Sequence, residues 1–360
     1  MSWVLAFIGF AALIILHEFG HFVAAKAVGM RVERFALFFP PLIWTVRRGE
    51  TEYGIGALPF GGYVRISGMN PDEELPPEVE HRAYYRQPAW KRIVVIAAGP
   101  FVNVLIAFVL IWGLYVLHGT YKPTTTVAEV TKASAAAAVL APGDRVLSVD
   151  GVKGDFDTMR AQIQRHRCPG GAERDGCVAA TPAQIEFVRD GQTRTAAVRP
   201  RYDAAAGRML VGYLPTEQRV RTGAVAGIGQ SVDQMWYVTK ATVGTIVRLF
   251  YDSRARKEVS SVAGAYKRTH DVIQSNQIAG AAWILAVISL SLAIINLFPF
   301  LPLDGGHIFW ALAEKVRGRP IDFKILERAS VVGFVLVLAL FAIGLSNDIS
   351  WFTAGSPANR

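Results

Sequence analysis

The residues best suited to chemistry form the segment His17-Glu18-Phe19-Gly20-His21. Residues four apart lie on one face of a helix, so the imidazoles of His17 and His21 can bind one metal ion as neutral ligands. The carboxylate of Glu18 lies beside them, where it can accept a proton from a water molecule. This spacing predicts a zinc-dependent hydrolytic centre. The alternative is a set of polar residues paired inside a helix bundle.

A second polar segment follows much later in the chain, Asn296-Leu-Phe-Pro-Phe-Leu-Pro-Leu-Asp304-Gly-Gly. Pro299 and Pro302 interrupt an apolar stretch and free backbone carbonyl groups from helical hydrogen bonds. Non-helical backbone and a carboxylate are tolerated at membrane depth only against protein or water, which indicates a functional site. Asp304 is therefore the predicted third zinc ligand, and it leaves a fourth position for water or substrate.

Four apolar stretches must position these residues: 3–28, 93–117, 279–303 and 331–345. The first three are long enough to cross a hydrocarbon core as helices, and the fourth is long enough when its flank from residue 329 is added. The first stretch resembles a cleaved signal only weakly, because it has no basic start and charged residues interrupt it. The hydrophobic fraction of 52% and the mean hydropathy of +0.29 agree with a multi-pass membrane protein.

Lysine and arginine residues gather in the two short loops, 29–92 and 304–328. The positive-inside rule places both loops in the cytoplasm and both termini outside it. The long segment from residue 118 to residue 278 is then extracytoplasmic. The formal charge of +9 fits this topology, and no basic cluster with interleaved aromatic residues predicts nucleic-acid binding.

The extracytoplasmic segment has two parts. Residues 125–215 are predicted to form a small β-rich domain with strands at 126–130, 145–149, 185–188 and 193–198. Residues 220–275 have the apolar spacing of an amphipathic helix that lies on the membrane surface or on the protease core. Cys168 and Cys177 are the only cysteines, and in this compartment they form either a loop-closing disulfide or two unpaired thiols. In the first cytoplasmic loop, residues 52–58 and 62–66 are predicted to form a hairpin near the membrane.

The chain resembles the site-2 protease family of intramembrane zinc metalloproteases, especially the bacterial regulator-of-sigma-E type. The resemblance covers nearly the whole chain in the same order. It rests on the His17–His21 motif and on three further segments, which are Pro59-Phe-Gly61-Gly62-Tyr63-Val64, Gly99-Pro-Phe-Val-Asn103 and the stretch from Asn296 to Gly306.

This resemblance implies one zinc ion held by His17, His21 and Asp304, with Glu18 as the catalytic base. It implies that Asn296 helps to hold the substrate, and that Gly61, Gly62 and Tyr63 belong to strands that pair with an unwound substrate helix. Single-span membrane proteins already shortened by an upstream protease are the implied substrates, with anti-sigma factors and remnant signal peptides as examples. From the residues alone, Asn103 is expected to serve in helix packing rather than in contact with substrate.

Residues 134–151 are similar to the core of bacterial PDZ domains, which bind C-termini by strand addition or exclude bulky substrates. The predicted architecture has four domains: an N-terminal protease core at 1–118, the extracytoplasmic PDZ-like domain at 119–215, an amphipathic linker at 216–278 and a C-terminal protease core at 279–360.

The predicted protein is thus an α-helical multi-pass enzyme of the bacterial inner membrane with a membrane-associated β-hairpin. Its active site faces the cytoplasmic side, and it acts in regulated intramembrane proteolysis. Two alternatives from other classes are a membrane metal transporter and a catalytically inactive PDZ scaffold. A transporter would need a second membrane-embedded ligand set, and a scaffold would not need Glu18.

Overall fold

The computed structural model describes residues 2–70, 72–132, 134–171, 174–204, 206–249, 251–252, 262–274, 278–319 and 321–354. Contacts between Cα atoms divide the chain into two compact units. Unit 1 contains Met1–His118 and Gly223–Arg360, and unit 2 is Gly119–Thr222. The predicted end of the β-rich domain at residue 215 falls within the last strand of unit 2, β10 (Tyr213–Val220).

Four helices of unit 1 are long and apolar enough to span a membrane, and they confirm the four predicted spans. They are α1 (Ser2–Ala27), α3 (Ala89–His118), α8 (Ile278–Asn296) and α10 (Phe323–Ala354). Exposed apolar side chains cover much of α10, including Val331, Val335 and Leu338. More than half of the surface of each of these side chains is exposed, which fits a helix that faces lipid.

The predicted interruption of the third apolar stretch, 279–303, is confirmed, because helix α8 ends at Asn296. Pro299 and Pro302 cannot donate backbone hydrogen bonds, so the chain leaves the helix before them. A turn over 297–303 follows, and a new helix, α9 (Asp304–Arg317), starts at the predicted metal ligand. The interruption therefore ends α8 at Asn296 and starts α9 at Asp304.

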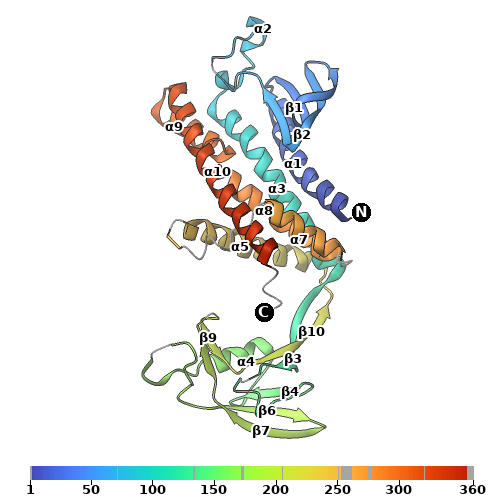
Figure 1. Ribbon diagram of the computed structural model, residues 1–360, viewed down its shortest axis with the longest axis vertical. Helices are drawn as coiled ribbons and strands as arrows, with labels where there is room; N and C mark the ends of the chain where they lie inside the picture. The colour runs from blue at the N-terminus through green and yellow to red at the C-terminus, as the bar shows by residue number, and fades with distance from the viewer. Residues whose placement is uncertain are drawn as a thin grey trace. The chain divides into compact units, whose positions relative to one another are not determined.

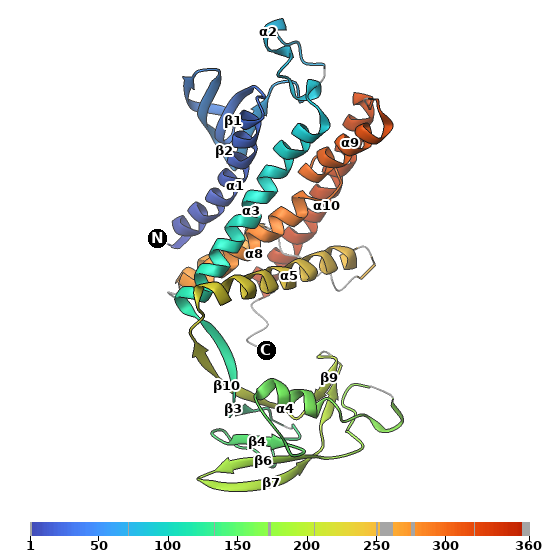
Figure 2. The same ribbon diagram turned by 180° about the vertical axis from the view of Figure 1, so that it is seen from behind.

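Helix α3 is the central element of unit 1, since it contacts α1, α8, α9 and α5 (Ala224–Leu249). Both views show α3 running beside α1 and α8, whereas α5 crosses the bundle (Figures 1 and 2). A cluster of buried apolar side chains joins α1, α3 and the hairpin that follows α1, with Ala25, Met30, Val32, Ile66 and Val95 as members. Helices α1 and α9, which carry the predicted ligands, thus both pack on α3.

The hairpin between α1 and α3 consists of β1 (Val32–Arg48) and β2 (Thr51–Ile66). The sequence predicted a hairpin of residues 52–58 and 62–66, but this pairing is wrong. Both segments belong to β2, and each pairs with β1, a strand that the sequence missed. The register explains the arrangement, because Leu37 of β1 lies opposite both Gly62 and Ile55. The first half of β1 therefore lies between residues 52–55 and 62–66, and residues 62–66 form an outer edge of this sheet.

Two short segments complete the loop before α3: α2 (Pro77–Glu80) and a 3₁₀ turn, η1 (Tyr84–Arg86). A polar clasp fixes this loop, because Glu50 at the tip of the hairpin binds Lys26 and Arg82. The Lys26 Nζ lies 2.7 Å from Glu50 Oε1, and the Arg82 Nη1 lies 2.6 Å from Glu50 Oε2. Arg82 also donates to the carbonyl oxygen of Gly29 at 3.0 Å. The clasp thus joins the end of α1, the hairpin and the loop.

This clasp predicts an acid-dependent loss of stability. Hydrogen bonds from Arg82 lower the pKa of Glu50 from 4.5 to about 2 against the opposing effect of burial. Because the pKa is lower in the folded protein, ionised Glu50 stabilises the fold fully above its ordinary pKa. That contribution is lost as the pH falls from about 4.5 towards about 2. The unfolding temperature in detergent should therefore fall more steeply between about pH 7 and about pH 3 for the wild type than for Glu50→Gln. Equal pH profiles would contradict the role of the clasp.

Unit 2 contains a sheet with the strand order β10-β3-β4-β6-β7, in which β5 also pairs with β4. The predicted strands are confirmed as parts of β3 (Thr120–Val130), β4 (Arg145–Val149), β6 (Ala183–Arg189) and β7 (Gln192–Val198). The turn between β6 and β7 is Asp190-Gly191, and both residues have the positive φ of a tight hairpin turn. The remaining elements are β5 (Val152–Lys153), α4 (Phe156–Ile163), η2 (Pro169–Gly171), β8 (Arg201–Asp203) and β9 (Arg208–Leu210).

The core of unit 2 packs Met159 of α4 against Val149, Ile185 and Phe187 of the sheet. A buried ion pair adds to it, because Arg189 Nη2 lies 2.7 Å from Asp144 Oδ2. Hydrogen bonds from Arg189 lower the pKa of Asp144, so this carboxylate stays charged. Cys168 and Cys177 are joined by a disulfide at the edge of the core.

The segment predicted to be amphipathic contains α5 and, after residues outside the described part of the chain, α7 (Val262–Gln274). One face of α5 packs on α3 and α8 through Val238, which lies in a cluster with Ala107 and Leu290. Val225, Val232 and Trp236 are exposed on α5. This helix therefore both packs on the protease core and presents apolar side chains outward.

Candidate metal centre

Three predicted ligands, separated by up to 287 positions in the chain, meet at one point of unit 1: His17, His21 and Asp304. The Nε2 atoms of the two histidines lie 3.2 Å apart. Asp304 Oδ2 lies 3.2 Å from His17 Nε2 and 3.4 Å from His21 Nε2. The three atoms thus form a nearly equilateral triangle, and both imidazoles are buried.

This triangle fits zinc. Tetrahedral zinc with bonds of about 2.0–2.1 Å keeps its ligand atoms about 3.3 Å apart, which matches the three observed separations. The buried Oδ2 of Asp304 has no hydrogen-bond donor among the described residues, so it is free to accept a metal ion. Two imidazoles and one carboxylate are also a ligand set typical of hydrolytic zinc sites, which keep a fourth position for water or substrate.

Helix α1 and the turn before α9 bring the ligands together. His17 and His21 are one helical turn apart on α1, so both imidazoles leave the same face. Asp304 is the first residue of α9. A Cβ atom added to Gly305 would lie against the carbonyl oxygens of Leu297 and Phe298. This close packing holds the start of α9 against the end of α8, which fixes the position of the Asp304 backbone.

Helix α3 packs against both imidazoles. His21 Nδ1 lies 2.8 Å from the carbonyl oxygen of Val95. One turn later, a Cβ atom added to Gly99 would lie 2.6 Å from His21 Cε1 and 2.9 Å from His17 Cε1. Glycine thus allows the α3 backbone to touch both rings. The sequence assigned no role to Gly99, although its place four residues before Asn103 on an apolar helix was a usable signal.

Glu18 follows His17 on α1 and is half-buried between the metal ligands and the hairpin. A Cβ atom added to Gly62 would lie 3.0 Å from Glu18 Cβ and still closer to its Cγ. The outer strand of the hairpin therefore passes directly beside the predicted base. This contact places the predicted substrate-binding residues Gly61, Gly62 and Tyr63 next to Glu18.

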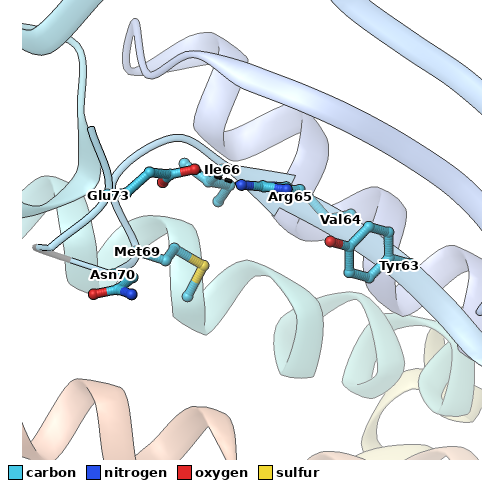
Figure 3. Close-up of a pocket in the computed structure, with 7 residues that line it drawn as sticks. All are labelled: Tyr63, Val64, Arg65, Ile66, Met69, Asn70 and Glu73. Atoms are coloured by element: carbon cyan, nitrogen blue, oxygen red, sulfur yellow. Dashed lines mark hydrogen bonds and ion pairs between the residues drawn. The ribbon is translucent and has the colours of Figure 1, made fainter. Parts of the chain in front are cut away.

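The same strand borders a cavity of about 380 Å³. Its walls are formed by the end of β2 and by the loop that follows (Figure 3), and its lining residues are Tyr63, Val64, Arg65, Ile66, Met69, Asn70 and Glu73. Arg65 reaches across the cavity wall to Glu73, with Nη2 and Oε1 2.5 Å apart. The cavity thus lies along the unpaired outer edge of the hairpin.

Two other residues stand near the centre without joining the ligand triangle. Asn296 is the last residue of α8 and is partly exposed. His307 lies on the first turn of α9, and the group of metal-binding side chains found among the described residues does not include it. The ligand group found among the described residues thus consists of the three residues that the sequence predicted.

Comparison with known proteins gives matches over nearly the whole chain. The family model for peptidase family M50 matches residues 5–340 of the chain. The matched range includes the greater part of each candidate membrane helix and all three residues of the metal centre.

Individual relatives align over almost the full length. The zinc metalloprotease Rip1 of Mycobacterium tuberculosis is 33% identical over 399 aligned residues, which cover 97% of this chain and 98% of the relative. A putative zinc metalloprotease of Rhizobium meliloti is 33% identical and covers 94% of both chains. A putative zinc metalloprotease of Nostoc is 32% identical over 94% of this chain and 93% of the relative.

Proposed function

This chain belongs to peptidase family M50 and is a zinc metalloprotease, and we propose that it cleaves the transmembrane segments of single-span proteins inside the membrane. The observation that carries the proposal is the position of the ligand triangle. Two of its members are on α1, a helix that is long and apolar enough to span the bilayer. A hydrolytic centre at that depth meets peptide bonds of membrane-embedded substrates rather than of soluble ones.

His17, His21 and Asp304 hold the ion in this proposal, and Glu18 is the general base. Zinc bound there supplies Lewis-acid chemistry, which polarises the scissile carbonyl group and increases the acidity of water. Glu18 takes one proton from the attacking water as its oxygen bonds to the carbonyl carbon. The carboxyl group of Glu18 then gives that proton to the amide nitrogen as the C–N bond breaks, so one water is consumed for each bond cleaved.

The outer strand of the hairpin receives the substrate. A transmembrane helix must unwind before its peptide bonds become accessible, and residues 62–66 offer an unpaired strand edge beside Glu18. Strand addition along Gly61, Gly62 and Tyr63 orients the substrate backbone, and the neighbouring cavity accepts a side chain. The amide group of Asn296 binds the substrate backbone from the other side.

Unit 2 selects substrates. Its β-rich sheet supports the PDZ-like assignment, which also rests on the similarity of residues 134–151 to PDZ domains. The domain lies outside the cytoplasm in the topology given by the lysine and arginine residues, and the active site faces the cytoplasm. Such a domain admits proteins that an upstream protease has shortened, such as anti-sigma factors and remnant signal peptides, in regulated intramembrane proteolysis at the bacterial inner membrane.

No observation specifically supports either alternative function, the metal transporter or the inactive PDZ scaffold. Metal transport requires a path of several sites, and His17, His21 and Asp304 are the one metal-ligand group in the part of the chain that the structure describes. An inactive scaffold has no use for a carboxylate beside a metal site.

Co-expression with a tagged single-span substrate tests the proposed function. Wild-type protein should yield a shortened product that disappears with a zinc chelator and returns when zinc is restored. Asp304→Ala removes a ligand and should lower both zinc content and product below detection. Glu327→Ala, which removes an exposed carboxylate of α10, is the matched control and should behave as wild type. Folded, zinc-loaded wild type that cleaves none of several substrates would overturn the proposal.

A further inference from the structure

Three residues of α3 face the histidines at successive helical turns: Val95, Gly99 and Asn103. Residues four apart lie above one another on a helix, so they form a single stripe. Val95 offers its carbonyl oxygen to His21, and Gly99 lets the backbone approach both rings. Asn103 completes the stripe beside His17, with its amide nitrogen Nδ2 3.1 Å from His17 Nδ1.

The contact with Val95 fixes how His21 can act. A carbonyl oxygen only accepts hydrogen bonds, so His21 Nδ1 must carry the proton and donate it to Val95. The lone pair of a neutral imidazole is then on Nε2, the atom that belongs to the ligand triangle. A backbone carbonyl thus holds His21 in the tautomer that binds metal.

His17 has the same requirement, but among the described residues the side chain of Asn103, rather than a backbone carbonyl group, faces its Nδ1. Its Nε2 lies in the ligand triangle, so its Nδ1 must carry the proton when zinc is bound. An amide nitrogen facing that Nδ1–H would place two donors against each other. The buried Oδ1 of Asn103 has no hydrogen-bond partner among the described residues, so a half-turn of the amide would break no bond made by that oxygen. Amide oxygen and nitrogen exchange places by a half-turn about the last side-chain bond, and the hydrogen-bond network decides between the two orientations.

We propose that Asn103 is a positioning residue of the metal centre, whose side-chain oxygen accepts a hydrogen bond from Nδ1 of His17. It holds the ring of His17 with Nε2 aimed at the metal, as Val95 does for His21. This inference rests on the proposed function, because it takes His17 as a zinc ligand. It also replaces the expectation that Asn103 serves only in helix packing.

Burial makes the role hard to replace. Asn103 is fully buried, so water cannot substitute for a lost amide oxygen. Ser289 of α8 is equally buried and donates through Oγ to the main-chain carbonyl oxygen of Asn103 at 2.8 Å. This bond joins α8 to α3 at the same residue, but it leaves the side chain of Asn103 untouched. Ser289 therefore offers a control that separates packing from positioning.

The test is zinc affinity, measured on purified full-length protein in detergent by competition with a chromophoric zinc chelator. Asn103→Leu keeps the volume but has no acceptor, and it should bind zinc about 10–100-fold more weakly than wild type. Asn103→Asp keeps an acceptor oxygen and should restore most of the affinity. Ser289→Ala should leave the affinity within about twofold of wild type.

The increase in unfolding temperature caused by zinc provides a second readout. If Asn103 served only in helix packing, its substitution would not change this increase. Zinc should raise the unfolding temperature of wild type and Asn103→Asp more than that of Asn103→Leu. Wild-type affinity in Asn103→Leu, or equal losses in the Leu and Asp variants, would overturn the positioning role while leaving the metal centre intact. Wild-type protein that binds no zinc in this assay would overturn the metal centre and this inference together.

Discussion

Gly99→Ala is expected to lower zinc affinity by roughly 100-fold or more and to remove protease activity with it. The added methyl group would lie against the Nε2 of His21 and within 3 Å of carbon atoms of both imidazoles. Such contacts are shorter than van der Waals distances, so the rings or α3 must move. A shift of even a few tenths of an ångström matters, because the two Nε2 atoms and Asp304 Oδ2 must keep their separations of 3.2–3.4 Å.

Gly113→Ala provides the matched control for this substitution. Gly113 is on the same helix, and a Cβ atom added there meets nothing within 4 Å. Alanine has the higher helix propensity, so this variant should be at least as stable as wild type and should bind zinc normally. Metal content by mass spectrometry and competition with a chelator measure both variants. Normal zinc binding by Gly99→Ala would contradict the packing of α3 against the histidine rings.

Glu18→Gln is expected to separate catalysis from metal binding. The amide of glutamine cannot accept the proton of the attacking water, and loss of a general base costs roughly 10²–10⁴-fold in rate. Glu18 is not part of the ligand triangle, so the zinc content should remain that of the wild type. The measurement is the rate of product formation from a single-span substrate reconstituted with the zinc-loaded protein.

The comparison with Asp304→Ala makes this prediction specific. Both variants should fail to cleave substrate, but only Asp304→Ala should lose zinc. If Glu18→Gln cleaves at the wild-type rate, Glu18 is not the base. If it loses zinc as well, its side chain serves the metal site rather than the reaction.

Local patterns in the sequence were sufficient for the elements whose formation depends on neighbours along the chain. A run of about twenty apolar residues specifies a membrane-spanning helix, because the backbone must satisfy its own hydrogen bonds in lipid. The spacing of His17 and His21 similarly fixes two ligands on one helical face. Asp190-Gly191 specifies its hairpin turn, since both residues tolerate positive φ.

Strand β1 was missed because its formation does not depend on its neighbours along the chain. Its sequence, Val-Glu-Arg-Phe-Ala-Leu-Phe-Phe-Pro-Pro-Leu, does not alternate between apolar and polar residues, and it contains two prolines. It forms a strand because it lies between two segments of β2, which pair with it on either side. Pairing of that kind depends on partners elsewhere in the chain and leaves little local trace.

The sequence by itself determined the four apolar spans and the placement of His17 and His21 on one helical face, because residue type and short-range spacing decide both. Asp304 was predicted as the third ligand from its chemistry, but it lies 283 positions after His21, so its approach to the two imidazoles depends on the packing of the helices. Only the tertiary structure decided what surrounds the metal centre. The packing of α3 brings Gly99 and Asn103 against the two imidazoles, and the folding of the hairpin brings Gly62 to Glu18. These contacts join residues 44–86 positions apart, and such distances are closed by helix packing and strand pairing rather than by local preference.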